Sequence, residues 1–302
     1  MSETAVQETQ ETPNSVPTSS ETQTTPPKRK SRWLRGLLLT LVVLVCALAG
    51  FIGWLVGTES GLRFGLYKIP SWFGVKIASE TLEGTLVKGF HGDKWMIETD
   101  GADVKISAFR FDWKPSELFQ RSLHITEIVA GDIAVVPKPT PPKEKKPSKG
   151  LPESIDLPVL VFIDRFETGR LSVGKNFDKQ TAYLDHLNAA YHYDQKEHRL
   201  DLKTLDTPWS NSTGSAVVGL EKPFALNTTI QTKGELEGET IEGKARLWGS
   251  LQDVQTEILL DGDDVHLSAK STVHPFAASL DKMIGEVLIK GFNINPTAFL
   301  PS

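Results

Sequence analysis

An uninterrupted apolar run from Gly36 to Gly57 constrains this chain more than any other feature of its sequence. The run holds no charged side chain, and at ~1.5 Å per residue a helix of this length extends roughly 33 Å, enough to cross the hydrocarbon core of a bilayer. We therefore predict a transmembrane helix over residues 34–57. Its anchoring side chains are Trp33, Leu37, Leu38, Leu39, Leu41, Val42, Val43, Leu44, Val45, Leu48, Phe51, Ile52, Trp54 and Leu55.

The charges that flank this run predict its orientation. Basic residues crowd its N-terminal side, whereas Glu59 and Arg63 nearly balance each other beyond its other end. Because positive charge is retained on the cytoplasmic side, we expect a cytoplasmic N-terminus and the export of everything after Thr58. Trp33 and Trp54 lie near the two ends, where indole rings prefer the headgroup layer. The topology-setting residues are Lys28, Arg29, Lys30, Arg32 and Arg35.

Two alternatives would remove the anchor. Residues 47–49 resemble a signal-peptidase site, with cleavage after Ala49, and Cys46 invites comparison with a lipoprotein cysteine. We favour a helix that is retained in the mature protein, because the apolar sequence continues past Ala49 to Val56. A lipoprotein cysteine is disfavoured because residues 43–45 lack the small side chains that precede one. Cys46 is the sole cysteine and fits better as a small apolar residue, so the exported part has no disulfide framework.

Composition divides the rest of the chain. Its 302 residues are 39% hydrophobic and 24% charged with a net charge of -5, which is typical of a folded protein and gives no sign of a nucleic-acid partner. Residues 1–30 are rich in Ser, Thr, Gln, Glu and Pro, and they predict a disordered cytoplasmic tail. We expect a membrane-proximal β region over 58–136, a Pro/Lys-rich loop over 137–150, and a continuing β-groove region over 151–302.

Period-two alternation dominates the exported part. Val104 and Ile106 have one parity, and Phe109, Phe111 and Trp113 have the other, so we predict a β-bulge between these sets. Short alternating runs separated by turn residues continue to residue 273 and indicate an antiparallel meander. The spacing over 275–284 predicts one helix that Gly285 ends. Residues 60–72 fit either a short interfacial helix ending at Pro70 or an extended entry into the sheet.

One face of the expected strands is apolar, and the chain supplies almost no helix to cover it. We predict a mainly β fold, with a single N-terminal transmembrane helix and an elongated antiparallel meander curled into an apolar groove. A closed β-sandwich is the alternative. An apolar groove rooted at a membrane could accept phospholipid acyl chains. The groove face comprises Val104, Ile106, Phe109, Phe111, Trp113, Leu226, Ile230, Ile258, Leu260 and Leu267.

No motif points to catalysis, a cofactor or a metal. Residues 238–245 approach a phosphate-binding loop, but Ala245 replaces the hydroxyl that would hold magnesium, so we interpret this stretch as a strand. His186, His192 and His198 are six residues apart, but an expected hairpin turn over 194–197 separates the last of them, and a solvated face explains them better than a metal site. The acidic cluster over 261–264 fits a hairpin turn. We expect no enzyme activity.

The order of several short motifs resembles the N-terminal part of the TamB family, within the AsmA-like group of bacterial envelope proteins. These motifs follow the apolar run in sequence: residues 82–86 (LEGTL), 89–90 (GF), 111–115 (FDWKP), 123–125 (LHI), 131–135 (GDIAV), a Pro-rich break, 157–159 (LPV), 285–289 (GEVLI) and 295–296 (NP). The resemblance spans roughly residues 36–302.

The resemblance implies a single-pass protein of the bacterial inner membrane, with its body in the periplasm. It implies transport of phospholipids toward the outer membrane, and assembly or secretion of client outer-membrane proteins with a barrel partner of the TamA type. Family members are much longer, and the C-terminal domain that engages that barrel has no counterpart here, so we expect a fragment or truncated product. No catalytic motif is implied. The alternative is a scaffold or chaperone for outer-membrane protein assembly that conducts no lipid.

Overall fold

The computed structural model describes residues 32–139, 151–236, 239–262, 265–277 and 283–292. The chain divides into two units, residues 1–48 and 49–302, with the boundary inside helix α1 (Arg32–Gly57). Helix α1 confirms the predicted helix, and Leu37–Gly57 is long and apolar enough to cross a membrane. Every side chain from Leu37 to Trp54 is exposed. The expected tail and Lys28, Arg29 and Lys30 lie outside the described residues.

Three short helical turns follow α1, which supports the helical alternative for residues 60–72. They are α2 (Glu59–Arg63), the π-helical turn η1 (Phe64–Lys68) and α3 (Ile69–Ser71). Thr58 has an extended backbone and its Oγ1 accepts the Gly61 N–H at 3.0 Å, so it ends one helix and caps the next. A Cβ at Gly61 would overlap the backbone of residues 54 and 55. Pro70 lies inside the last turn and does not end it.

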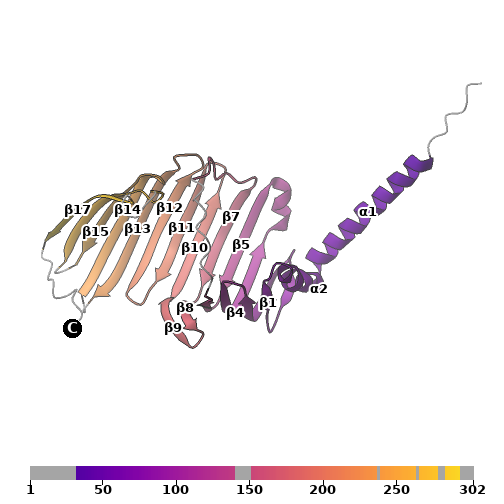
Figure 1. Cartoon of the computed structure of the whole chain (residues 1–302), viewed down its shortest axis with the longest axis horizontal. Coiled ribbons are helices and arrows are strands. Elements are labelled where there is room, and N and C mark those ends of the chain that lie inside the picture. The colour runs from indigo at the N-terminus through magenta and orange to yellow at the C-terminus, as the bar shows by residue number, and fades with distance from the viewer. Residues whose placement is uncertain (1–31, 140–150, 237–238, 263–264, 278–282, 293–302) are drawn as a thin grey trace, which may run out of the picture. The chain divides into compact units, whose positions relative to one another are not determined.

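One mixed sheet follows these turns (Figure 1). Its strands are β1 (Lys76–Ala78), β2 (Glu83–Thr85), β3 (Gly89–Glu98), β4 (Ala102–Trp113), β5 (Ser122–Ala130), β6 (Ile133–Pro137), β7 (Leu160–Thr168), β8 (Leu171–Asn176), β9 (Lys179–Leu184), β10 (His186–Tyr193), β11 (Glu197–Asp206), β12 (Ser210–Gly219), β13 (Ala225–Leu236), β14 (Glu239–Ser250), β15 (Val254–Asp261), β16 (His266–Val273) and β17 (Ile284–Phe292). A 3-10 turn, η2 (Pro115–Gln120), joins β4 to β5.

The predicted antiparallel meander holds from β10 to β17, where each strand pairs with the next. It fails earlier in the chain, because β5 pairs with β7 in parallel and β6 pairs with β8 in parallel. The long connection after Pro137 brings the chain back to Leu160, so that β7 starts beside the start of β5. A tight turn would have reversed the strand direction instead.

The predicted β-bulge between residues 108 and 109 is wrong, because β4 contains no extra residue there relative to β3. The less exposed side chains of β4 nevertheless change from one face of the strand to the other at this point. Strands β3 and β4 keep one register from the Phe90–Phe111 pair to the Glu98–Asp103 pair. The buried positions of β3 change parity in the same place, at Lys94, whose φ is +49°. Because both strands change face together, neither needs an extra residue. The register shift of β4 lies instead at Asp112 and Trp113, against β5.

The predicted helix over residues 275–284 is wrong at both described ends. The Ala277 N–H bonds the His274 carbonyl at 3.0 Å in a turn, and Ile284 is the first residue of β17, paired with Val273. Residues 278–282 lie outside the described part. Gly285 continues the strand and ends no helix. Of the apolar residues whose helical spacing suggested this helix, Phe276 lies in a turn, and Ile284 lies in β17 on the same side of the sheet as its partner Val273.

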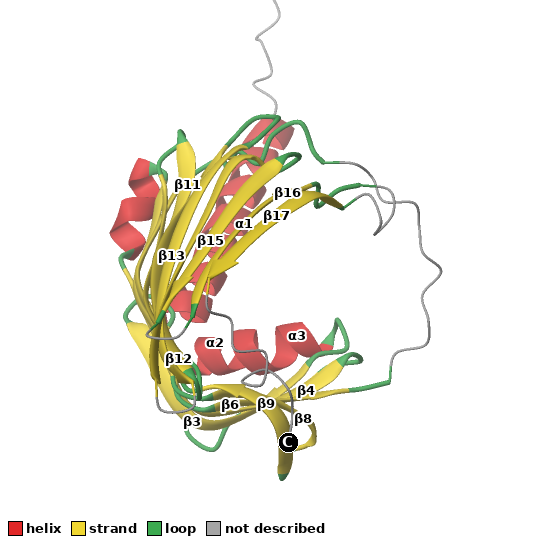
Figure 2. Cartoon of the chain, turned by 90° about the vertical axis from the view of Figure 1, so that its left-hand side faces the viewer, coloured by secondary structure: helices red, strands yellow, loops and turns green. Residues whose placement is uncertain are grey.

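The sheet curls without closing, which decides between the groove and the sandwich. Figure 2 shows the strands β11 to β17 and the strands β3 to β9 as two arms of one curved sheet, with α2 and α3 on its concave side. The core cluster Leu62, Leu82, Phe90 and Trp95 lies where these turns pack on the first strands. The fold is therefore the predicted open groove.

Candidate functional site: an apolar concave face

Cross-strand pairing joins the apolar side chains into one surface, which we call the inner face. Direct partners in an antiparallel or parallel ladder project to the same side of a sheet. One unbroken row of partners runs from β3 to β17 and defines this face. The row consists of Phe90, Phe111, Ile128, Phe166, Ala189, Leu202, Gly214, Ile230, Ala245, Ile258, Ala269 and Ile289.

All ten predicted groove residues lie on the inner face. Phe111, Ile230 and Ile258 belong to the row itself. Phe109, Leu260 and Leu267 belong to the neighbouring row two positions along. Trp113, Leu226, Ile106 and Val104 lie at further even steps, once the shared change of face in β3 and β4 is taken into account.

The opposite face, which we call the outer face, is more polar, although it also carries the exposed Leu259 and Leu288. At the far end of the sheet it carries the directly paired residues Arg246, Glu257 and Lys270, and the Glu257 and Lys270 side chains form an ion pair at 2.7 Å. Lys233 and Glu242 form another at 3.1 Å. Along β13 the outer-face residues are exposed and the inner-face residues are half-buried, although no further layer of the sheet covers them. Curvature therefore shelters the inner face.

The inner face is covered by the chain itself at its first strands. Leu62, which is buried, and the half-buried Leu66 and Tyr67 come from the helical turns and join the cluster that contains Trp95 and Phe90. Ile106, Phe109 and Phe111 pack against the same cluster. These three predicted lipid contacts are thus in contact with protein.

A second element of the chain crosses the inner face at β10 and β11. We call Glu153–Leu157 the strap. The Ile155 N–H donates to the Leu220 carbonyl at 3.0 Å, and the Leu157 N–H donates to the Tyr193 hydroxyl at 3.0 Å. Tyr193 is fully buried and donates its own proton to Asp156 Oδ1. Burial, and then the bond to Asp156, raises the pKa of Tyr193.

His198 completes the attachment of the strap. Its Nε2 lies 2.9 Å from the Ile155 carbonyl oxygen and must donate to it, so Nδ1 is the acceptor for the Tyr191 hydroxyl at 2.5 Å. The His198 ring also stacks on Tyr193 at 4.7 Å. No local pattern predicted this role, because 43 residues separate His198 from Ile155.

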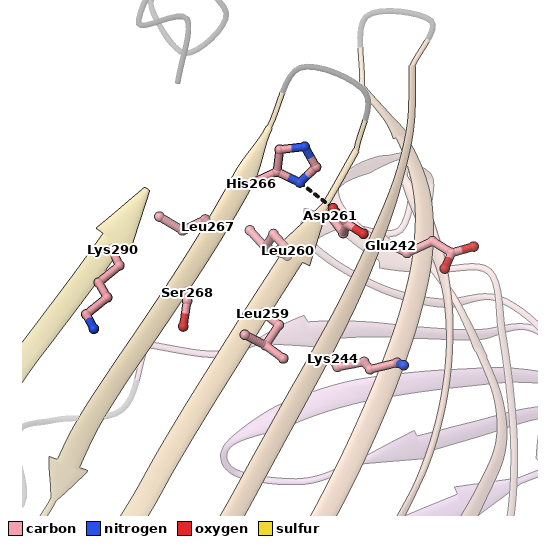
Figure 3. A pocket seen from close by; sticks show the side chains of 9 residues that line it. All are labelled: Glu242, Lys244, Leu259, Leu260, Asp261, His266, Leu267, Ser268 and Lys290. Atoms are coloured by element: carbon pink, nitrogen blue, oxygen red, sulfur yellow. Dashed lines mark hydrogen bonds and ion pairs between the residues drawn. The ribbon is translucent and has the colours of Figure 1, made fainter. Parts of the chain in front are cut away.

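Open inner face remains between the strap and β17. Ile230, Ile258, Leu260 and Leu267 belong to this part, and the Ile258 side chain is 38% exposed. A cleft of about 420 Å³ opens at β14 to β17 (Figure 3), but it belongs mainly to the opposite side of the sheet. Its lining includes one row of direct cross-strand partners, Lys244, Leu259, Ser268 and Lys290, which lies one position away from the inner-face row. The inner-face residues Leu260 and Leu267 only border this cleft, and the His266–Asp261 pair stands at its edge.

The residues considered for chemistry are not brought together. His186 and His192 project to the outer face of β10, whereas His198 projects inward from β11. The hairpin between them is confirmed: Asp194 Oδ1 accepts the Lys196 and Glu197 N–H groups, and the pKa of Asp194 is lowered chiefly by the first of these bonds. Over the described ranges, no group of histidine, cysteine and carboxylate side chains could hold a metal ion.

The other two candidate motifs behave as turns and strands. Residues 239–245, the near match to a phosphate-binding loop, belong to β14. At the acidic cluster, the Gly262 N–H bonds the Val265 carbonyl at 2.9 Å and closes the β15–β16 connection. Residues 263 and 264 lie outside the described residues, as does Gly238.

Comparison with known proteins gives the family. The family model described as TamB, N-terminal domain, matches residues 48–207, from the last turns of α1 through β11. No curated protein and no solved structure matches the chain. The match covers more than half of the chain and includes the covered inner face, the strap and its partners Tyr193 and His198. With one exposed apolar helix among the described residues, the chain fits a membrane-anchored envelope protein, and it belongs to the TamB family through the N-terminal domain that it contains.

Proposed function

We propose that this chain moves phospholipids from the inner to the outer membrane along its inner face, without catalysis. The observation that carries the proposal is the unbroken apolar row from β3 to β17 on a sheet that does not close on itself. At ~4.8 Å between neighbouring strands, the row extends roughly 50 Å across the sheet. Where neither the helical turns nor the strap covers the row, each step from strand to strand offers an acyl chain a new apolar contact at nearly constant free energy.

The contrast between the two faces supports a lipid and not a soluble ligand. Acyl chains gain about 25 cal/mol per Å² of apolar surface removed from water, and only the inner face offers such surface continuously. The zwitterionic or anionic headgroup stays hydrated at the open side. In this arrangement α1 anchors the protein in the inner membrane with a cytoplasmic N-terminus, and the sheet lies in the periplasm. A barrel of the TamA type and client outer-membrane proteins are the partners that the family suggests.

A matched pair of neighbouring residues tests the conduit. Ile258 and Leu259 are 38% and 42% exposed and project to opposite faces of β15. A photo-crosslinking side chain at 258, and likewise at 230, should give phospholipid adducts in cells, whereas one at 259 should give none. Ile258→Asp should block lipid transport, because a carboxylate among acyl chains is costly, and Leu259→Asp should not. Equal lipid labelling at 258 and 259 would refute the conduit.

A scaffold function is the second candidate, and one observation favours it. The apolar side chains of β17, among them Ile284, Val287 and Ile289, are at least half exposed. An extended segment of a client protein could add to this strand by β-augmentation. Crosslinks from β17 to unfolded client proteins, with no lipid adduct at 230 or 258, would establish the scaffold in place of the conduit.

A further inference from the structure

A line of aromatic rings leads from the end of α1 into the first turns of the sheet-bearing unit. The ring centroids of Phe51 and Trp54 lie 5.9 Å apart, those of Trp54 and Phe64 lie 5.8 Å apart, and those of Phe64 and Trp72 lie 6.2 Å apart. The last two distances limit the separation of Trp54 and Trp72 to about 12 Å. The end of the apolar helix and the loop after α3 are therefore close neighbours.

The helical turns carry apolar side chains on two sides, and the sheet covers only one of them. Leu62, Leu66 and Tyr67 pack toward the core cluster. On the other side, Trp72 is 70% exposed and its neighbour Phe73 is 80% exposed. Two adjacent aromatic side chains are less favourable in water than in an apolar environment. Something apolar is expected to cover them.

Hydrogen bonds hold this exposed pair near the helix end. The Val87 N–H donates to the Val56 carbonyl at 3.0 Å, which joins the β2–β3 turn to the last turn of α1. The Arg63 guanidinium donates to the Leu82 carbonyl at 2.8 Å and to Glu59 at 2.7 Å. The turns are thus tied to both α1 and the sheet, so Trp72 and Phe73 stay near the C-terminal end of α1.

We propose that Phe64, Trp72 and Phe73 insert into the headgroup layer of the bilayer that α1 spans, as a second, peripheral contact with the same membrane. Tryptophan favours this layer because its ring is apolar and its indole N–H can stay hydrated, and the two phenylalanine rings gain free energy by leaving water. Lys68, which is exposed and four residues from both Phe64 and Trp72, adds a cation at the level of the lipid phosphates. The contact holds the start of the inner face at the membrane surface. The proposal does not depend on lipid transport.

Spin labels on the full chain test the contact. Cys46→Ser removes the natural cysteine, and Phe73→Cys or the matched control Phe276→Cys then carries the label. Phe276 is also an exposed phenylalanine, at 58%, but it lies in the turn after β16. The protein is reconstituted in vesicles of phosphatidylethanolamine and phosphatidylglycerol. We expect the label at 73 to collide often with oxygen and rarely with a water-soluble nickel chelate, and the label at 276 to collide often with the chelate.

Each result decides the proposal. Frequent oxygen and rare nickel collisions at position 73 support insertion. Frequent nickel collisions at 73, as at 276, would mean that the loop is in water and would overturn it. Rare collisions with both reagents would mean that protein covers the loop, which overturns it equally. Trp72→Cys repeats the measurement at an independent position, in case Phe73→Cys alters the fold. Transport need not be measured, so a failed conduit would leave this result intact.

Discussion

Removing one hydroxyl should release the strap from the inner face. Tyr193→Phe keeps the buried ring but deletes the oxygen that accepts the Leu157 N–H and donates to Asp156. Two hydrogen bonds are then lost, and because a hydrogen bond in a protein contributes about 0.5–1.5 kcal/mol net, the strap should lose about 1–3 kcal/mol of stability. Tyr183→Phe is the control, because Tyr183 is 42% exposed and its ring lies beside Arg170, away from the strap.

Hydrogen exchange followed by mass spectrometry measures this release on the intact chain. The amides of Ile155 and Lys222, which bond the Leu220 and Glu153 carbonyls, report strap opening. A loss of about 1–3 kcal/mol should speed their exchange about 5- to 150-fold in Tyr193→Phe, if exchange proceeds by local opening. Strand β14 should be unaffected. Exchange at Ile155 and Lys222 no faster than in Tyr183→Phe would refute the reasoning that this hydroxyl holds the strap.

Three further predictions concern stability. The Trp95 ring is buried, but its Nε1 has no hydrogen-bond partner among the described residues. Trp95→Ala should therefore lower the free energy of unfolding by about 3–5 kcal/mol, and Trp95→Phe should lower it much less because no hydrogen bond is lost. Similar losses for the two variants in denaturant unfolding would contradict this. Burial alone lowers the pKa of His124, but its hydrogen bonds to Asp164 and Glu117 together raise that pKa above its ordinary value. The stabilisation of the fold by protonated His124 is therefore complete below about pH 6.5 and is lost as pH rises through the raised pKa. Melting temperature measured against pH should show this loss in the wild type and not in His124→Gln. Gly89 has φ +87°, and a Cβ there would meet the Asp112 side chain and, at 2.7 Å, the Phe111 carbonyl oxygen. Gly89→Ala should therefore lower the free energy of unfolding by about 1–3 kcal/mol, whereas Gly101→Ala, in open space, should not. Equal melting temperatures for the two variants would count against this.

Most of the candidate site was predictable because face assignment in a strand depends on local parity. Ile230 and Ile258 lie 28 positions apart, yet their alternation within their own strands was enough to place both on one side. The change of face near residue 108 was visible in the same way. Its mechanism was not, since it required knowing that β3 changes parity at Lys94 opposite that point.

What covers the inner face was not predictable. Phe109 and Phe111 have the same alternation as Ile258, and nothing in their own strand distinguishes a residue packed under a helical turn from one that is open. The distinction depends on Leu62, which lies 47 positions before Phe109 and reaches it only through the tertiary fold. The strap is a similar case, because its partners are remote in sequence.

The sequence by itself determined the membrane helix, the strand content and the division of each strand into an apolar and a polar side. These features follow from helical length and from period-two alternation, which act within a few residues. Only the tertiary structure decided the parallel pairing of β5 with β7, the open curl, and the two elements that cover part of the inner face. Those outcomes depend on contacts between distant segments, whose free energy no local pattern encodes.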